Sequence, residues 1–355
     1  MTVLYLNLSI VYLFSLLSRY LSTPTSLNPA LVKPHKLFVL LAISTLVLVS
    51  GLRNNIGDTY YYMHSYREHP MTWDKVFDGK DPGFNILQLL LQQLSSDPQL
   101  LLLVTALLTN TLIVITLYKY SRFFELSLYV YITLGYFLVS MNGVRQYLAA
   151  AIVFIATKYL LEGKFKRYVL VVLLASTFHQ SALILIPIYF IVRRPAWSKV
   201  TFILLASSIL IVLGFNQFMD LLFTAIEDTQ YGDYKSFEGV GANKLRVAVA
   251  GVPLLIAYIG REKLKNIFPH SDVIINMSLL GFIFMVISTQ NWIFARFTIY
   301  FGLYQLVLIS WIVLLFREKD RKLVYFGIIV CYFIYFYFEH VLSLNIIYRS
   351  NYINL

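Results

Sequence analysis

Apolar runs of roughly twenty residues recur along the whole chain, and short polar segments separate them. A helix of about that length crosses the roughly 30 Å hydrocarbon core of a bilayer. The pattern therefore predicts an all-α, polytopic membrane bundle of about twelve transmembrane helices. The expected helices cover residues 2–18, 37–52, 98–118, 125–140, 143–161, 167–178, 181–192, 199–215, 245–260, 273–290, 296–316 and 323–342.

Two stretches deviate from a pattern of full crossings. The segment "DPGFNILQLLLQQL" (81–94) is apolar on one side and carries three glutamines, which favours an interfacial or re-entrant helix. The runs 167–178 and 181–192 are short, so they fit one span, a re-entrant hairpin or two tilted helices.

Composition agrees with a membrane protein. Of 355 residues, 59% are hydrophobic and 13% are charged, whereas a soluble domain carries roughly 25% charge. Because no soluble segment stands out, the chain is expected to form one integral membrane domain over residues 1–355. Cys331 is the lone cysteine, which leaves no intrachain disulfide.

The basic residues indicate an orientation. Nineteen of the 29 basic but only six of the 18 acidic residues fall near 19–36, 119–125, 158–167, 193–199, 261–272 and 317–322, which are alternate loops of the predicted bundle. The positive-inside rule makes these loops cytoplasmic and puts both termini outside. The net charge of +11 is thus explained by topology, and no nucleic-acid partner is expected. Two long external segments, 53–97 and 216–244, then direct attention to the outer face.

An arginine heads one of these apolar runs. Arg145 stands in "SMNGVRQYLAAAIVFIA", although a charged side chain at the centre of a helix in hydrocarbon costs about 2.5–3.5 kcal/mol on insertion scales. Asn142, Arg145 and Gln146 are spaced i, i+3, i+4 and therefore project from one helical face. Water at the membrane edge or a ligand that needs a fixed cation would offset the cost.

Other polar residues fall at the same predicted membrane level. They are Arg53, Asp58, Thr59, Tyr60, Tyr62, Tyr66, Asp81, His179, Arg246, Arg296 and Tyr300. Each has a plainer reading: arginines snorkel to headgroups, tyrosines form an interfacial belt, a helix-end histidine is hydrogen-bonded, and Asp81 caps the helix that follows Pro82. Their convergence favours a ligand path at the outer face, since ionisable groups within membranes tend to face a bundle interior.

The segments that hold these residues resemble the landmarks of the EpsG-like family. In order they are "GLRNNIGDTYYYMHSY", "DPGFNILQLLLQQL", the block from "MNGVRQYL" to "FHQSALILIPIYF", and "FARFTIYF", over roughly residues 36–305. That family comprises multi-spanning bacterial exopolysaccharide and O-antigen polymerases of the broad Wzy-like type. Two positions depart from its pattern: Asp81 replaces the usual glutamate, and one residue is missing between Gly57 and Asp58.

The resemblance implies an enzyme of the bacterial cytoplasmic membrane with an extracytoplasmic active site, for which a glycosyltransferase-C-like fold is one option. It would move a growing glycan from polyprenyl diphosphate, such as undecaprenyl diphosphate, onto a lipid-linked repeat unit. We expect Arg53, Arg145 and Arg296 to stabilise the diphosphate in place of a metal, with Arg145 and Arg296 as catalytic residues. Asp58 and His179 are the candidates for the general base, and His179 could equally donate to the diphosphate.

We expect Tyr60, Tyr62 and Tyr66 to carry sugar rings. The other expected substrate-binding residues are Arg53, Thr59, Asp81, Asn142, Gln146 and Tyr300. No cofactor and no metal are predicted, and a chain-length regulator and a flippase are the expected protein partners. The main alternative is a flippase or transporter of the same lipid-linked oligosaccharides, which would need polar residues at the midplane and on both faces. A glycan-modifying acyltransferase is a second alternative, although the short cytoplasmic loops offer no evident catalytic site.

Overall fold

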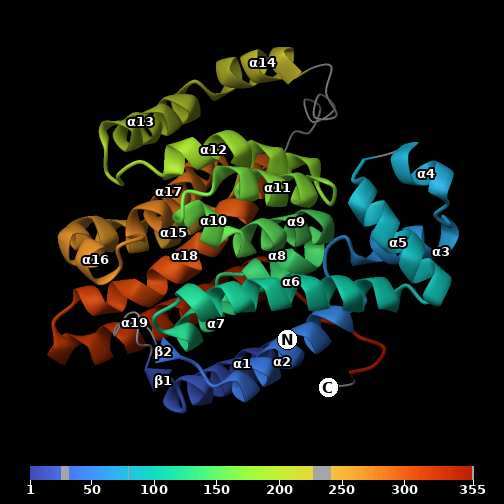
Figure 1. Ribbon diagram of the computed structural model, residues 1–355, viewed down its shortest axis with the longest axis horizontal. Coiled ribbons are helices and arrows are strands. Elements are labelled where there is room, and N and C mark those ends of the chain that lie inside the picture. The colour runs from blue at the N-terminus through green and yellow to red at the C-terminus, as the bar shows by residue number, and fades with distance from the viewer. Residues whose placement is uncertain (25–31, 79, 227–240, 354–355) are drawn as a thin grey trace. The chain divides into compact units, whose positions relative to one another are not determined.

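The computed structural model describes residues 1–24, 32–78, 80–226 and 241–353 (Figure 1). The chain divides into two compact units. Unit 1 comprises Met1–Phe190 and Ile309–Leu355, and unit 2 comprises Ile191–Leu308. The described part is predominantly helical, with one short two-stranded antiparallel sheet. This confirms the helical membrane architecture in outline, while the single domain stays a prediction.

Unit 1 is built around three adjacent long helices. The helix α2 (Lys36–Gly51) packs against both α1 (Thr2–Tyr20) and α6 (Gln99–Tyr120), and α6 continues the layer onto α9 (Val144–Ile155). The other elements of unit 1 are β1 (Thr23–Pro24), β2 (Val32–Lys33), α3 (Thr59–Glu68), α4 (Trp73–Asp78), α5 (Pro82–Leu94), α7 (Phe124–Thr133), α8 (Tyr136–Asn142), α10 (Thr157–Leu161), α11 (Phe165–Ser176), a 3₁₀ turn (Gln180–Ile184), most of α12 (Leu185–Val192), a 3₁₀ turn (Val313–Leu315), α19 (Glu318–Phe336) and a π-helical turn (Tyr337–Ser343).

Unit 2 is centred on α17 (Ser271–Ile287), which packs against α13 (Lys199–Leu213) and α15 (Lys244–Ile259). Its other elements are α14 (Phe215–Ile226), α16 (Arg261–Ile267), a 3₁₀ turn (Trp292–Phe297) and most of α18 (Thr298–Ile312). The predicted external segment 216–244 is therefore helical at its start, and its part from 227 to 240 lies outside the described residues.

The predicted count of about twelve spans is not confirmed. Within the described residues, four helices are long and apolar enough to cross a membrane, or up to six if each of two bent helix pairs forms one span. The physical reason is that many predicted runs are interrupted. The run 143–161, for example, is divided between α9 and α10 at Ala156, so each piece is shorter than a full crossing.

The first of the two segments predicted to be external, 53–97, is largely helical. It contains α3, α4 and α5, which Figure 1 shows grouped at one end of α6. The predicted helix at 81–94 exists as α5, and its buried face includes Phe84 and Leu89. Its 13 residues are too few to cross the bilayer in the way a 20-residue helix does. This agrees with the interfacial or re-entrant interpretation.

The opposite end of unit 1 collects basic loops. Arg19 Nε lies 2.9 Å from the buried carboxylate of Glu125, and the Tyr325 hydroxyl donates to the same carboxylate at 3.0 Å. Arg19 and Glu125 come from segments that the charge pattern places on one side of the membrane, and Tyr325 lies three residues after another such segment, 317–322. Their contact supports the alternation of sides within unit 1.

Candidate active site

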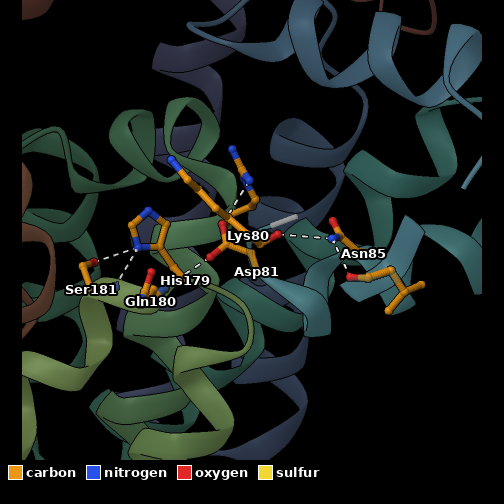
Figure 2. Close-up of polar contacts among 8 residues, drawn as sticks. Lys80, Asp81, Asn85, His179, Gln180 and Ser181 are labelled. Atoms are coloured by element: carbon orange, nitrogen blue, oxygen red, sulfur yellow. Dashed lines mark hydrogen bonds and ion pairs between the residues drawn. The ribbon is translucent and has the colours of Figure 1, made fainter. Parts of the chain in front are cut away.

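Asp81 joins three segments that are distant in the sequence (Figure 2). Its Oδ2 lies 3.0 Å from Arg145 Nη1, at the start of α9. Its Oδ1 accepts a hydrogen bond of 3.2 Å from the backbone N–H of Gln180. Because Asp81 itself precedes α5, one carboxylate ties α5, α9 and the turn that follows α11.

The backbone of Asp81 is unusual in a way that matches this role. It adopts the left-handed conformation, with φ 62° and ψ 57°, which costs a non-glycine residue roughly 1–2 kcal/mol. Pro82 then occupies the first turn of α5, where its missing N–H is not needed. Burial raises the pKa of the Asp81 carboxyl, and the nearby Arg145 guanidinium partly opposes that shift.

A small hydrophobic cluster brings these segments together. Its buried members are Tyr66, Phe84, Leu91, Leu101 and Val144, and Tyr62 and Phe178 pack against it. Val144 precedes Arg145 and Phe178 precedes His179, so apolar packing sets the distance between the polar groups. Burying a large apolar side chain stabilises by about 1.5–3 kcal/mol, which exceeds the strain at Asp81.

Gly83 makes the same junction close-fitting. Its N–H donates to the Thr177 carbonyl at 2.7 Å, and a Cβ added to Gly83 would lie 2.2 Å from Thr177 Oγ1. Only a glycine lets α5 approach the turn after α11 this closely.

Arg145 is held at one side and open at the other. Its side chain is 40% exposed, whereas that of Asp81 is 7% exposed. The guanidinium carbon lies 5.9 Å from the centre of the Phe84 ring, and Tyr62 and Asp58 also interact with it electrostatically. The guanidinium is therefore oriented by the protein while part of its surface can meet a ligand.

Asp58 precedes α3, and its carboxylate does not cap the helix. It occupies the N-cap position, and its side chain makes no capping hydrogen bond. Its backbone N–H donates to Asn142 Oδ1 at 2.9 Å. Gly57 before it has φ +54°, and an added Cβ would lie 2.2 Å from the same oxygen. The turn thus places the Asp58 carboxylate within electrostatic reach of Arg145.

Arg53 occupies a very different environment from Arg145. It is 1% exposed. Its Nε donates to Thr59 Oγ1 at 2.9 Å, its Nη2 donates to the Met141 carbonyl at 2.7 Å, and its Nη1 donates to the Ser50 carbonyl. Burial lowers its pKa to about 10, so it stays charged at neutral pH. Arg53 ties the end of α2 to α3 and α8.

His179 is fixed by its neighbours. The Ser181 N–H donates to His179 Nδ1 at 3.4 Å, and Ser181 Oγ lies 2.7 Å from the same nitrogen. Gln146 Nε2 approaches Ser181 Oγ at 3.5 Å. A backbone N–H can only donate, so Nδ1 accepts and the proton of the neutral imidazole belongs on Nε2.

The structure distributes the remaining predicted residues of unit 1 in different surroundings. Tyr60 is 65% exposed and stacks on His64, with ring centres 5.7 Å apart. Tyr62 is half-buried, whereas Tyr66 is buried and donates its hydroxyl to the Ser95 carbonyl at 2.9 Å. Of the three predicted sugar platforms, Tyr60 presents the most surface. That all three bind sugar stays a prediction.

The prediction that Asn142, Arg145 and Gln146 project from one face of a continuous helix is wrong. The helix breaks at Gly143, so Asn142 ends α8 while Arg145 and Gln146 lie in α9. All three side chains nevertheless reach segments of one cluster: Asn142 contacts Asp58, Arg145 contacts Asp81 and Gln146 approaches Ser181, as given above.

Three predicted residues belong to unit 2. Arg296 lies exposed in a 3₁₀ turn, with its guanidinium carbon 5.2 Å from the centre of the Trp292 ring. Tyr300 is buried, and Arg246 lies in the first turn of α15. Their convergence with the unit 1 residues stays a prediction.

Several residues of the cluster were not singled out from the sequence. Ser181 lies inside the quoted "FHQSALI" motif, so the motif itself was the available signal. Gly83 and Thr177 gave no periodic signal, because their contact joins two segments nearly a hundred residues apart. Among the described residues, no group of three or more His, Cys, Asp or Glu side chains is arranged to hold a metal ion. Metal-free chemistry stays a prediction.

Comparison with known proteins gives one assignment. The family model described as the EpsG family matches residues 36–353, which is most of the chain. No curated protein and no solved structure matches the chain significantly. The match includes the polar residues around Asp81 and Arg145 and the hydrophobic cluster beside them.

Proposed function

Because the chain belongs to the EpsG family, whose members are generally glycosyltransferase-like exopolysaccharide polymerases, we propose that it lengthens a lipid-linked glycan. The donor is a polyprenyl diphosphate that carries the growing chain. The acceptor is a second lipid-linked repeat unit. The reaction takes place on the extracytoplasmic face of the bacterial cytoplasmic membrane.

The observation that carries the proposal is the environment of Arg145. Its guanidinium is oriented by Asp81, partly exposed, and surrounded by segments that also bring Asp58 and His179. A fixed guanidinium suits a diphosphate, since its planar fork matches two phosphate oxygens. Asp81 engages Nη1, Tyr62 forms a further hydrogen bond with the guanidinium, and the 40% of the side chain that stays exposed is the part that a ligand can meet.

The role of Arg145 follows from the bond that breaks. The C1–O bond between the sugar and the diphosphate cleaves, and its electron pair goes to the leaving phosphate oxygen. A preorganised cation at that oxygen stabilises the developing charge more than the ground state. Arg296 is proposed as a second diphosphate contact, on the family motif alone.

His179 is assigned as a hydrogen-bond donor. Its Nδ1 is occupied as an acceptor by Ser181, so its Nε2–H can donate to the diphosphate but cannot take a proton. The contact with Ser181 supports the donor role over the base role for His179. The ¹⁵N chemical shifts of the His179 ring in labelled protein measure the tautomer directly, and a protonated Nδ1 in the neutral ring would contradict the assignment.

Asp58 is then the general base. The acceptor hydroxyl oxygen attacks C1, and its proton passes to the Asp58 carboxylate. That carboxylate is not used to cap α3. General-base assistance of this kind is worth roughly 10²–10⁴-fold in rate. The charges balance, since one hydroxyl proton moves to Asp58 as the diphosphate leaves with its polyprenol.

Reconstitution tests the proposal. Purified protein in proteoliposomes is given a synthetic polyprenyl-diphosphate repeat unit, and the products are separated by size. We expect a ladder of lengthened, lipid-linked glycans. Movement of the substrate between leaflets without lengthening would instead establish the flippase alternative and refute the polymerase. Substrate confined to the lumen or to the outside of oriented vesicles then reports the active face.

A further inference from the structure

The end of the chain lies along the loop that carries Arg53. In residues 347–352, which we name the C-terminal strap, Ser350 forms an antiparallel bridge with Arg53. The backbone N–H of Asn54 donates to the Arg349 carbonyl at 3.0 Å. These backbone pairs connect two stretches nearly three hundred residues apart, and both belong to unit 1.

Side chains strengthen this pairing from both partners. Both polar atoms of the Asn55 side-chain amide bind the strap. Nδ2 donates to the Ile347 carbonyl at 2.6 Å, and Oδ1 accepts from the Arg349 N–H at 2.7 Å. Ser350 Oγ donates to the Leu52 carbonyl at 2.6 Å. An amide that donates and accepts together fixes both the distance and the direction of the loop.

The strap also reaches the last turn of α2. The buried Tyr348 donates its hydroxyl to the Val49 carbonyl at 2.9 Å. From the side of α6, Gln99 Nε2 donates to the carbonyls of Gly51 and Arg53 at 2.5 Å and 3.1 Å. The loop after α2 is therefore held between the start of α6 and the strap, although it has no regular secondary structure of its own.

We infer that Asn55, Tyr348 and Ser350 are positioning residues for the active site, an inference that rests on the proposed function. By fixing the loop they fix Arg53, whose guanidinium binds Thr59 at the start of α3. Asp58 lies between Arg53 and Thr59 in the sequence, so fixing these two residues also fixes the position of Asp58 relative to Arg145. The strap acts through the loop and touches no substrate.

The decisive variants are Asn55→Ala, which removes both side-chain bonds to the strap, and Ser350→Ala. Asn54→Ala is the graded comparison, because it removes one side-chain hydrogen bond to the strap, from Asn54 Nδ2 to Asn351 Oδ1, where Asn55→Ala removes two. We expect Asn55→Ala to speed amide hydrogen exchange over residues 52–59 by about tenfold or more, since local opening then loses two hydrogen bonds. Asn54→Ala should speed exchange of these amides clearly less than Asn55→Ala does, because it removes one hydrogen bond and not two.

Turnover distinguishes positioning from mere stability. In the reconstituted assay, Asn55→Ala and Ser350→Ala should lower kcat by about tenfold or more while KM for the donor changes little, because Arg145 is untouched. Ser350→Thr keeps the hydroxyl and should restore kcat. Equal losses in Asn54→Ala and Asn55→Ala, or unchanged exchange and kcat in Asn55→Ala, would overturn the inference.

The two proposals fail separately. Hydrogen exchange is measured on the protein without substrate, so it reports the strap even if no polymer forms. A wild-type protein that makes no polymer refutes the proposed function and with it any catalytic role for the strap. A wild-type protein that makes polymer, beside an Asn55→Ala variant of equal kcat, refutes the strap alone.

Discussion

A double-mutant cycle on Asp81 and Arg145 tests whether the carboxylate acts through the guanidinium. The variants are Asp81→Asn, Arg145→Lys and the two combined. Asn keeps the size of the side chain and removes its charge. Lys keeps the charge of residue 145 but loses the planar fork. Arg67→Lys and Asp74→Asn repeat both changes at exposed positions of α3 and α4 and serve as controls.

The structure sets the expected magnitudes. Loss of one donor to a developing oxyanion costs about 10²–10³-fold in kcat, or about 2.7–4 kcal/mol, and this is the expectation for Arg145→Lys. An exposed ion pair contributes about 0.2–1 kcal/mol, and a hydrogen bond to a charged group about 1.5–3 kcal/mol. With a donor–acceptor distance of 3.0 Å but an Arg145 side chain 40% exposed, we expect about 1–2 kcal/mol for Asp81→Asn, roughly 5–30-fold in kcat.

The combined variant carries the test. If Asp81 serves only to orient Arg145, nothing remains for it to orient once the fork is gone, and the double variant should match Arg145→Lys within about threefold. The assay is the rate of glycan lengthening in proteoliposomes, normalised to folded protein. Multiplying losses, about 5 × 10²- to 3 × 10⁴-fold in all, would show that Asp81 has an independent role and refute the orienting argument.

Four further outcomes are expected. Since burial raises the pKa of Asp81 and the ion pair needs its charged form, activity should fall on acidification at a higher pH than an ordinary aspartate gives. Thermal stability should not fall together with activity. A carboxyl group whose pKa is raised in the folded state stabilises that state at low pH, and this stabilisation is lost as the pH rises. A melting temperature that dropped in parallel with activity would contradict this. Asp58→Asn should lower kcat by roughly 10²–10⁴-fold where the wild-type carboxylate is deprotonated, and unaltered turnover at all pH values would exclude Asp58 as base. Gly83→Ala should reduce the melting temperature and polymer yield, whereas Gly327→Ala, with nothing within 4 Å of an added Cβ, should reduce neither; equal melting temperatures would contradict the close approach. Arg53→Lys should destabilise the fold by about 1–3 kcal/mol by leaving buried carbonyls unpaired, as measured by thermal melting against wild type.

The sequence predicted the elements of the fold much better than its spans. Hydrophobic periodicity located α1, α2, α6 and α13 to within about two residues at each end, because each is a continuous apolar run bounded by polar residues. The count of about twelve spans is not confirmed among the described residues, because hydropathy does not register a break between two apolar helices. The run 125–140 is continuous in hydropathy, yet it bends by 55° between α7 and α8, where Gly135 has φ +87°.

For the candidate site, the sequence found residue types and missed the pairing. Arg145 was conspicuous because a charge in an apolar run is costly, and Asp81 followed from the family pattern. That these two residues pair could not be read from one sequence, since they are 64 positions apart and the apolar cluster around Phe84 decides the contact. The pairing of the C-terminal strap with the loop after α2 was not predicted at all, because backbone hydrogen bonds do not require particular residue types.

The contrast between Arg53 and Arg145 explains why intramembrane charge alone could not assign roles. Both arginines stand at helix ends and both bear the cost of desolvation. Arg53 is 1% exposed, and its guanidinium donates to two carbonyls and a hydroxyl. These hydrogen bonds join α2, α3 and α8. Arg145 meets one carboxylate oxygen, keeps 40% of its side chain exposed, and depends on a strained aspartate for its direction. Backbone strain of this kind clusters at functional sites, and here it occurs beside the arginine that a ligand can reach.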